Sequence, residues 1–334
     1  MAWHAIRPHD TVQVRDGRLF NASLNSQGRT VLPTPNTVGG AMGSAAPGGR
    51  FGWLRGPLLG QDVGASWTPF FSLPRDIGSA SNGNSQRAHV VTRVASGSVV
   101  LGTHDLVFDG PGGEYSESYI RPDDLASYLS DPTGEVPPSA CISTTEILET
   151  ERRVGLARDD FVAREGYFYQ TAHLRLRDEF AFLAECDIEI DAGNVPLGGA
   201  MRRAAIEPVA VDPWPAIPRD FPDGRLLVYV ATPAIWQDGA VPPPIPAAAL
   251  IACSIGSPIP AALGASRVNG TTKTQFKWMV PAGSVYYFQF ETNAAASLWA
   301  SSHHATAWGR PGSAPEQDNF TSTGFGVILT GRWE

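Results

Sequence analysis

The residues best suited to chemistry fall in one alternating stretch, Tyr167–Arg177. In an extended strand, successive side chains point to opposite faces. One face would carry Tyr167, Tyr169, Thr171, His173, Arg175 and Arg177, and the other Phe168, Gln170, Ala172, Leu174 and Leu176. Aromatic rings beside cations can stack on bases and neutralise phosphates of single-stranded nucleic acid. An ordinary half-buried strand with a polar outer face is the alternative interpretation of the pattern.

Other groups capable of chemistry are scattered. Four carboxylates alternate in a predicted strand over Phe180–Ile190, namely Glu185, Asp187, Glu189 and Asp191. Four like charges without a nearby histidine favour a solvent-facing strand over a metal site. His173 and His304 have no neighbour in sequence that would mark a general base, and the motifs of serine hydrolases, zinc proteases and phosphate-binding loops are missing. We therefore predict no catalytic residue, no metal and no cofactor.

Composition describes a globular protein with room for two domains in 334 residues. The 35 glycines and 28 prolines favour many short strands and ordered loops over a helical bundle. The net charge of −8 argues against a broad basic surface, unless the cations are clustered. Of the 25 basic residues only Lys273 and Lys277 are lysines. A GC-rich genome explains that bias most simply, although arginine also binds phosphate with two hydrogen bonds.

Three widely spaced cysteines indicate reduced thiols, and we expect a cytoplasmic protein. The first residues show no signal-peptide pattern, and no apolar run reaches the length of a membrane span.

The elements that would position a site include several glycine-rich turns and a short helix. Strand pieces at Trp3–Ile6 and Thr11–Val14 lead to a turn flanked by Arg15 and Arg18. A helix over Val38–Ala46, capped by Asn36 or Thr37, would add its free amides to an anion site. Gly198 and Gly199 allow backbone that other residues forbid, and Arg202 and Arg203 follow at once. Gly324 and Gly326 form a second loop able to hold a phosphate on backbone amides.

Residues from about 47 to 140 are irregular and rich in Gly, Ser, Pro and Asn, as expected of an insertion. Within it we predict a hairpin of His89–Val94 with Ser98–Leu101.

Several short pieces occur in an order typical of one family. They read RPHDTVQVRDGRLF, LPTPNTVGGAM, ERRVGLARDD, EGYFYQTAHLRLR, VPLGGAMRR, LLVYVATPAIW, VPAGSVYYFQF and TGFGVILTGRW. Together they resemble the third subunit of the Cmr complex, the type III-B CRISPR RNA-guided effector of the RAMP superfamily. The resemblance spans nearly the whole chain except 47–140. One departure is that Ala200 and Met201 follow the glycine pair, where the family usually has a glutamate and then an arginine.

The resemblance implies an α+β fold of two ferredoxin-like (RRM-like) domains with antiparallel sheets, at 1–192 and 193–334, with the insertion in the first. It implies a non-catalytic scaffold that anchors the 5′ handle of the guide RNA. Its partners would be the large polymerase/HD-nuclease subunit and the backbone RAMP subunit, with target RNA contacted only indirectly and no membrane. The residues that the resemblance implies are Arg15, Arg18, Gly198, Gly199, Arg202, Gly324 and Gly326. Pattern alone adds Arg153, Tyr169, His173, Arg175, Arg203, Lys273 and Lys277.

Three alternatives remain open at this point. The chain could be an RNA-processing endonuclease of the same superfamily, with His173 or His304 as the base. It could be a β-rich protein-binding module without RNA contact. It could also be the equivalent subunit of a Csm complex, although the aromatic strand VPAGSVYYF favours the Cmr type.

Overall fold

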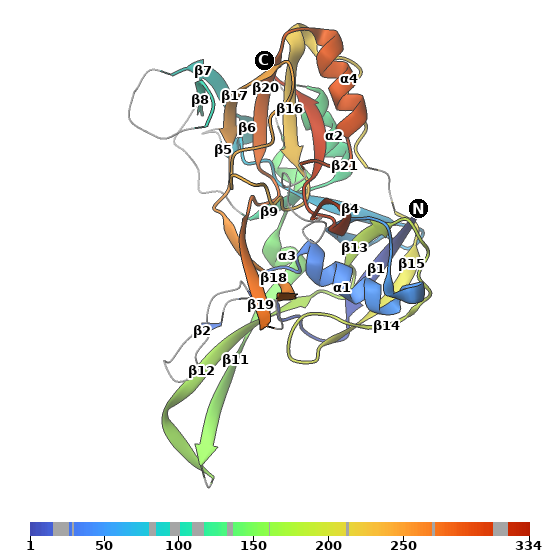
Figure 1. The fold of residues 1–334 in the computed structure, drawn as a ribbon, viewed down its shortest axis with the longest axis vertical. Coiled ribbons are helices and arrows are strands. Elements are labelled where there is room, and N and C mark those ends of the chain that lie inside the picture. The colour runs from blue at the N-terminus through green and yellow to red at the C-terminus, as the bar shows by residue number, and fades with distance from the viewer. Residues whose placement is uncertain are drawn as a thin grey trace.

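The computed structural model is built around two mainly antiparallel sheets and two long projecting hairpins, with short strand pairs and few helices besides (Figure 1). It describes residues 1–15, 27–28, 30–79, 85–93, 101–108, 117–131, 136–159, 161–211, 214–268, 271–309 and 320–334. The predicted α+β class is confirmed. Within this described part, no helix is long and apolar enough to cross a membrane.

The N-terminal sheet has the strand order β10-β9-β4-β3-β13-β1-β15-β14. Its strands are β1 (Ala2–Pro8), β3 (Leu54–Asp62), β4 (Trp67–Ser72), β9 (Ser118–Ile120), β10 (Cys141–Ser143), β13 (Phe180–Cys186), β14 (Gly193–Pro196) and β15 (Arg203–Val209). In the register of the central strands, Ala5 lies opposite Leu183 and Ile6 opposite Ile206. The predicted strand at Thr11–Val14 forms only an isolated bridge, between Val12 and Leu174.

Helix α1 (Pro35–Ala45) covers one face of this sheet. Val38 and Met42 are buried there in the same cluster as Ile6. Proline fits the first helical position because its fixed φ suits a helix and its missing N–H would be unbonded there anyway. The helix therefore begins at Pro35 after the N-cap residue Thr34, and the predicted caps Asn36 and Thr37 were wrong.

The C-terminal sheet has the strand order β17-β20-β16-β22-β21. Its strands are β16 (Arg225–Val230), β17 (Ala248–Ser254), β20 (Val285–Phe290), β21 (Thr306–Ala307) and β22 (Val327–Arg332). Alternate residues of β16 enter two different cores. Leu226 and Val228 pack in the cluster of helix α4 (Asn293–His303), whereas Leu227 and Tyr229 pack in the cluster on the other face.

The second face of the C-terminal sheet is covered by helix α2 (Pro122–Ser130), which belongs to the earlier part of the chain. Leu125, Tyr128 and Leu129 of α2 share a buried cluster with Leu227 and Leu329 of the sheet. Helices from distant parts of the sequence thus enclose this sheet from both sides.

A buried polar group fastens α2 in place. Arg87 closes the short strand β6 (Ser85–Arg87), which pairs with β5 (Ile77–Ser79). Its guanidinium donates to the carbonyl oxygens of Tyr128 and, at 3.0 Å, Arg332. It also faces the carboxylate of Asp76 at 3.6 Å, and both side chains are buried. Asp76 in turn accepts hydrogen bonds from the hydroxyls of Tyr128, at 2.7 Å, and Tyr287. We call these four side chains the Arg87 lock.

The two sheets repeat one arrangement. We compare two sets of four strands in chain order: β1, β3, β13 and β15 in the N-terminal sheet, and β16, β17, β20 and β22 in the C-terminal sheet. In each set the first strand lies between the third and the fourth. In each set the second strand lies on the outer side of the third. Helix α1 follows the first strand of its set, and α4 follows the third strand of its own.

The N-terminal sheet extends past residue 192, where the sequence-based division was placed, because β14 and β15 pair next to β1. The expected insertion at about 47–140 contains β3 and β4 of that sheet, and α2 besides. Its predicted hairpin exists with another partner strand, since β7 (His89–Thr92) pairs with β8 (His104–Val107). The expected strand at Ser98–Leu101 lies mostly outside the described residues.

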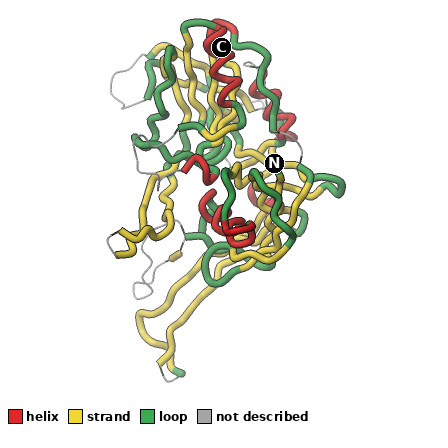
Figure 2. Tube along the Cα trace, turned by 45° about the vertical axis from the view of Figure 1, so that its right-hand side comes forward, coloured by secondary structure: helices red, strands yellow, loops and turns green. Residues whose placement is uncertain are grey.

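Two long hairpins leave the body on the same side (Figures 1 and 2). The longer one joins β11 (Leu148–Asp159) to β12 (Val162–Leu176), after the short helix α3 (Thr144–Ile147). A two-residue strand, β2 (Gln27–Gly28), pairs with β12 in parallel. The shorter hairpin joins β18 (Ile259–Val268) to β19 (Thr271–Met279). Each carries exposed apolar side chains, among them Phe161 and Trp278.

Candidate nucleic-acid interface

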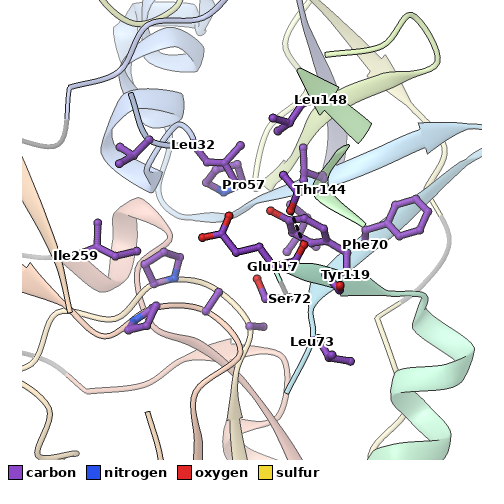
Figure 3. A pocket seen from close by; sticks show the side chains of 18 of the residues that line it. Leu32, Pro57, Phe70, Ser72, Leu73, Glu117, Tyr119, Thr144, Leu148 and Ile259 are labelled. Carbon is purple, nitrogen blue, oxygen red and sulfur yellow. Dashed lines mark hydrogen bonds between the residues drawn. The ribbon is translucent and has the colours of Figure 1, made fainter. Parts of the chain in front are cut away.

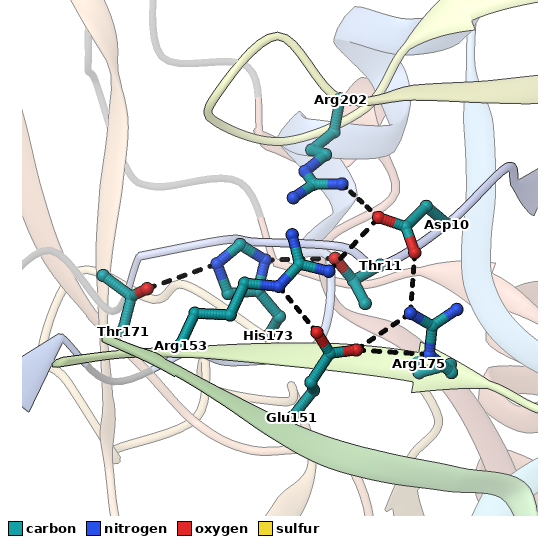
Figure 4. A network of polar contacts seen from close by, with 8 residues as sticks. All are labelled: Asp10, Thr11, Glu151, Arg153, Thr171, His173, Arg175 and Arg202. Carbon is teal, nitrogen blue, oxygen red and sulfur yellow. Dashed lines mark hydrogen bonds and ion pairs between the residues drawn. The ribbon is translucent and has the colours of Figure 1, made fainter. Parts of the chain in front are cut away.

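Three arginines from separate elements converge on Asp10 (Figure 4). Arg175 of β12 approaches Asp10 Oδ1 at 2.7 Å, and Arg153 of β11 approaches Oδ2 at 3.3 Å. Arg202, from the turn between β14 and β15, pairs with the same Oδ2. We call Asp10, Glu151 and these three arginines the arginine cluster.

Glu151 is the second carboxylate of the cluster. It accepts from Arg153 Nε at 2.7 Å and from Arg175 Nη2 at 2.8 Å. Three cations therefore face two anions, which leaves one positive charge in excess. The arginine side chains remain between 21% and 45% exposed, so a ligand can reach them.

The register of β11 with β12 places the cluster on one face of the hairpin. Glu151 lies opposite His173, Arg153 opposite Thr171, and Gly155 opposite Tyr169. The predicted alternation was thus right, but the sequence did not show that β11 would put a carboxylate on the same face. Tyr169 lies across Gly155, where an added Cβ would come within 2.0 Å of the ring. The tyrosine is half-buried by its own hairpin and is not an open stacking surface.

His173 lies buried beneath the cluster. Its Nδ1 is 3.1 Å from Thr11 Oγ1, and its Nε2 is 3.3 Å from Thr171 Oγ1. Val12 and Leu174 exchange two backbone hydrogen bonds at 2.7 and 2.9 Å. These contacts clamp the segment after β1 onto β12, and they position Asp10 between the arginines.

The glycine pair brings Arg202 to the same place. Gly198 has a φ of +76°, and an added Cβ would lie 2.5 Å from the carbonyl oxygen of Gln13. The Gly199 amide donates to that oxygen at 2.7 Å, and the Leu197 amide donates to the Arg202 carbonyl at 2.9 Å. Only glycine fits this close approach of the turn to the N-terminal segment. Ala200 and Met201, which separate the glycine pair from Arg202, do not prevent Arg202 from reaching Asp10.

The cluster shifts the titration of its members. Burial alone would raise the pKa of Asp10, but hydrogen bonds from Arg175, Arg202 and Arg153 outweigh it and hold the pKa far below its ordinary value. Hydrogen bonds from Arg153 and Arg175 lower the pKa of Glu151. Burial first, and then the charges of Arg153 and Arg202, lower the pKa of His173. Both carboxylates are therefore ionised and the imidazole is neutral at pH 7.

Acid should destabilise the protein as pH falls below the ordinary histidine value of 6.5. Burial lowers the pKa values of His4, His173 and His304. The unfolded chain therefore binds protons first, and the stability present above 6.5 is lost below it. We expect the urea midpoint to fall between neutral pH and about pH 5. The His173→Gln variant should show a shallower fall, and an unchanged slope would contradict the assignment. Asp10 contributes only at lower pH, below its ordinary value of 3.8.

The remaining predicted residues lie elsewhere. Arg15 is exposed, and its backbone pairs with Thr30 downstream of Asp10. Arg203 donates to the Asn194 carbonyl within the N-terminal sheet. The two lysines lie on β19, with Lys277 exposed. Arg18 lies outside the described residues.

Gly324 and Gly326 are buried, in contrast to the expected open phosphate loop. A Cβ on Gly324 would lie 2.5 Å from Leu54 Cδ2 and 2.7 Å from the Gly56 carbonyl oxygen. The Gly326 amide donates to Pro233 at 2.9 Å. Gly324 packs the chain before β22 against β3 of the N-terminal sheet, whereas Gly326 lies 3.0 Å, measured from an added Cβ, from the Trp308 carbonyl oxygen in the C-terminal half. Close backbone packing explains both glycines.

The alternating carboxylates do not form a shared face, because β13 ends at Cys186. Glu185 is buried and pairs with Arg55 at 2.7 Å. Asp187 accepts from the Gly52 amide at 2.9 Å. No group of metal-binding side chains occurs among the residues that the structure describes.

His304, the other candidate base, is engaged at both nitrogens. Nδ1 accepts from the Thr330 amide at 3.0 Å, so Nε2 carries the proton and donates to the Pro215 carbonyl at 2.7 Å. Such a histidine holds a loop to the sheet and has no free lone pair for a substrate proton.

A cavity of about 610 Å³ lies where the two sheets meet (Figure 3). Leu32, Pro57 and Phe70 line it from the N-terminal half, and Ile259 and Met279 from the β18–β19 hairpin. The Thr144 hydroxyl donates to the Glu117 carbonyl at its wall. Leu174 also lines it, so the cavity and the arginine cluster lie on opposite faces of β12. Its mixed, mainly apolar wall does not point to a particular cofactor.

Sequence reasoning missed Asp10, Thr11 and Glu151. Glu151 stands two residues before Arg153, which was selected, whereas Asp10 stands five residues before Arg15. A local signal, an acid beside arginines, was therefore available for Glu151 but not for Asp10. Only the tertiary pairing shows that both acids orient the same guanidiniums.

Comparison with known proteins gives a consistent result. A family model described as CRISPR-associated protein (Cas_Cmr3) matches residues 4–333. A chain of the cryo-EM structure of a Type III-B Cmr-beta bound to cognate target RNA and AMPPnP has a TM-score of 0.56 at 14% identity, covering 99% of both chains. A chain of a Type III-B Cmr-beta structure with cognate target RNA has a TM-score of 0.50 at 16% identity, covering 85% of this chain and 86% of that one. No curated protein sequence matches the chain.

Proposed function

The chain belongs to the Cmr3 family of CRISPR-associated proteins, and from this premise we propose that it binds guide RNA in a type III-B Cmr complex as a non-catalytic scaffold. The RNA segment it holds is the 5′ handle. The protein joins the large polymerase/HD-nuclease subunit to the backbone subunit, contacts target RNA only indirectly, and works in the cytoplasm.

The arginine cluster carries this proposal. Guanidinium groups bind phosphate with paired, charge-assisted hydrogen bonds. Asp10 and Glu151 hold Arg153, Arg175 and Arg202 in fixed positions before any ligand arrives, which reduces the entropy lost on binding. A compact site of this kind suits a few backbone phosphates of a single strand. The net charge of −8 fits no broad duplex-binding surface.

We propose further that each sheet is a ferredoxin-like unit that has kept one of its two crossover helices. The repeated strand arrangement of the two sets and the positions of α1 and α4 support this. The boundary then falls between the end of β15 at Val209 and the start of β16 at Arg225.

Crosslinking inside an assembled effector tests the function. A guide RNA carrying photoreactive nucleotides in its handle should crosslink to peptides containing Arg153, Arg175 or Arg202. Crosslinks of the handle only to other subunits would reject the proposal. Incubating the purified chain with precursor repeat RNA tests whether the scaffold is non-catalytic. Defined cleavage products would show that the chain is an endonuclease.

Affinity should depend on assembly. One excess charge in the cluster gives modest binding to the isolated chain, and neighbouring subunits supply the remaining contacts. A gel shift that shows tight binding of the chain alone at physiological salt would contradict this.

A further inference from the structure

The β18–β19 hairpin exposes two aromatic side chains on one strand. Phe276 is 55% exposed and Trp278 is 61% exposed. The base of the hairpin is anchored, since Leu263 and Met279 are buried in a cluster with Phe325. Covering large exposed rings with a partner is favourable, because it removes apolar surface from water. The anchored hairpin holds the rings in place for such a partner.

The spacing of the two rings suits stacked bases. Residues two apart on a strand share a face and lie roughly 6.5 Å apart along it. This is about twice the 3.4 Å between neighbouring bases of one strand. Each ring can therefore take a base of its own, or one base can lie between them.

Trp278 also forms a wall of an apolar hollow of about 490 Å³. Ile255, Pro258, Met279 and Val280 form other walls. A base stacked on Trp278 would meet further apolar surface there, with no need for a particular hydrogen-bonding edge.

Charge singles out this hairpin from the rest of the chain. From Gly239 through Phe290 there is no aspartate or glutamate, and the cations are Arg267, Lys273 and Lys277. The remainder therefore has 22 cations against 33 acids, a sum of −11. By contrast, residues 148–176 of the longer hairpin contain five arginines and five acids. Of the two long hairpins, the shorter one therefore combines the exposed rings of Phe276 and Trp278 with a sequence that has cations and no acid.

We propose that the β18–β19 hairpin is a stacking platform for unpaired RNA bases, with Phe276 and Trp278 under the bases and Lys277, on the other face of the strand, attracting the phosphate backbone through its charge. Sequence-tolerant stacking on aromatic rings beside cations is how proteins hold single strands. The platform is a second RNA contact, separate from the arginine cluster, and it rests on the proposed RNA-binding function. It predicts a preference for single-stranded RNA over duplex of the same sequence.

Fluorescence anisotropy with the full chain and a labelled oligouridine tests the platform. Trp278→Leu and Phe276→Leu should each weaken binding about tenfold, whereas Trp278→Tyr should keep most of the affinity. Lys277→Gln should reduce the slope of log Kd against log salt by about 0.7. Phe161→Leu is the matched control, because Phe161 is an exposed ring, at 95%, on the charge-balanced hairpin. Equal losses in Phe161→Leu and Trp278→Leu would overturn the proposal.

The outcomes separate this platform from the cluster. If Trp278→Leu leaves RNA affinity unchanged while variants of Arg202 weaken handle binding, the platform is rejected and the proposed function stands. If the wild-type chain binds no RNA either alone or in the assembled effector, the proposed function fails as well. If Trp278→Leu loses a co-purifying protein subunit but keeps its RNA affinity, the face is a protein interface and the platform is rejected.

Discussion

Replacing Arg87 by methionine lowers the free energy of unfolding by about 3–5 kcal/mol, the loss expected when one partner of a buried ion pair is removed. The side chain of Asp76 has no exposure and that of Arg87 has 6%. Without Arg87 the carboxylate keeps its tyrosine hydrogen bonds but loses its counter-ion. The carbonyl oxygens of Tyr128 and Arg332 lose a charged donor at the same time.

Urea denaturation of the full chain measures this effect, with Arg50→Met as the control. Arg50 is exposed, and its loss should change stability by less than about 0.5 kcal/mol. The double variant Asp76→Asn/Arg87→Met should recover much of the loss, because no unpaired charge is then buried. Equal stability of Arg87→Met and Arg50→Met would show that the lock contributes nothing.

Substituting Arg153, Arg175 and Arg202 together by glutamine should weaken binding of handle RNA about 100-fold. Each guanidinium can donate a charge-assisted pair of hydrogen bonds to phosphate, and part of that gain is offset by its contacts with Asp10 and Glu151. Fewer released counterions should also lower the slope of log Kd against log salt by about 2.

The measurement is a salt titration of RNA binding by the assembled effector. The control variant replaces Arg50, Arg121 and Arg219, all exposed and outside the cluster, and has the same loss of charge. If both triple variants weaken binding equally, general charge and not the cluster holds the RNA. Retained affinity in the cluster variant would place the handle elsewhere.

Local pattern predicted the long strand β12 well. The alternation of Tyr167–Arg177 matches β12. Periodicity depends on the strand alone, so it survives in the fold. The pairing of strands depends on residues far away, and for that reason the partner of β7 was misplaced.

The site was predicted only in part, because residue types can be read from the sequence whereas tertiary contacts cannot. Arg153, Arg175, His173, Gly198 and Arg202 were selected, and they meet in the structure. Gly324 was selected for a loop chemistry that burial removes, since glycine is also required where two backbones pack closely. A glycine required for a positive φ and a glycine required for close backbone packing cannot be distinguished from the sequence. Only tertiary contacts distinguish a glycine that faces a ligand from one that faces Leu54.

The helix that closes the C-terminal sheet is synthesised long before the sheet exists. Ser130 ends α2, while β22 begins only at Val327. At ribosomal rates of about 5–20 residues per second, that gap lasts on the order of 10–40 seconds. During this interval Leu125, Tyr128 and Leu129 have no complete sheet to pack against, so the nascent chain exposes an aggregation-prone apolar surface. Nascent chains of this protein should therefore depend on chaperones until β22 has emerged from the ribosome.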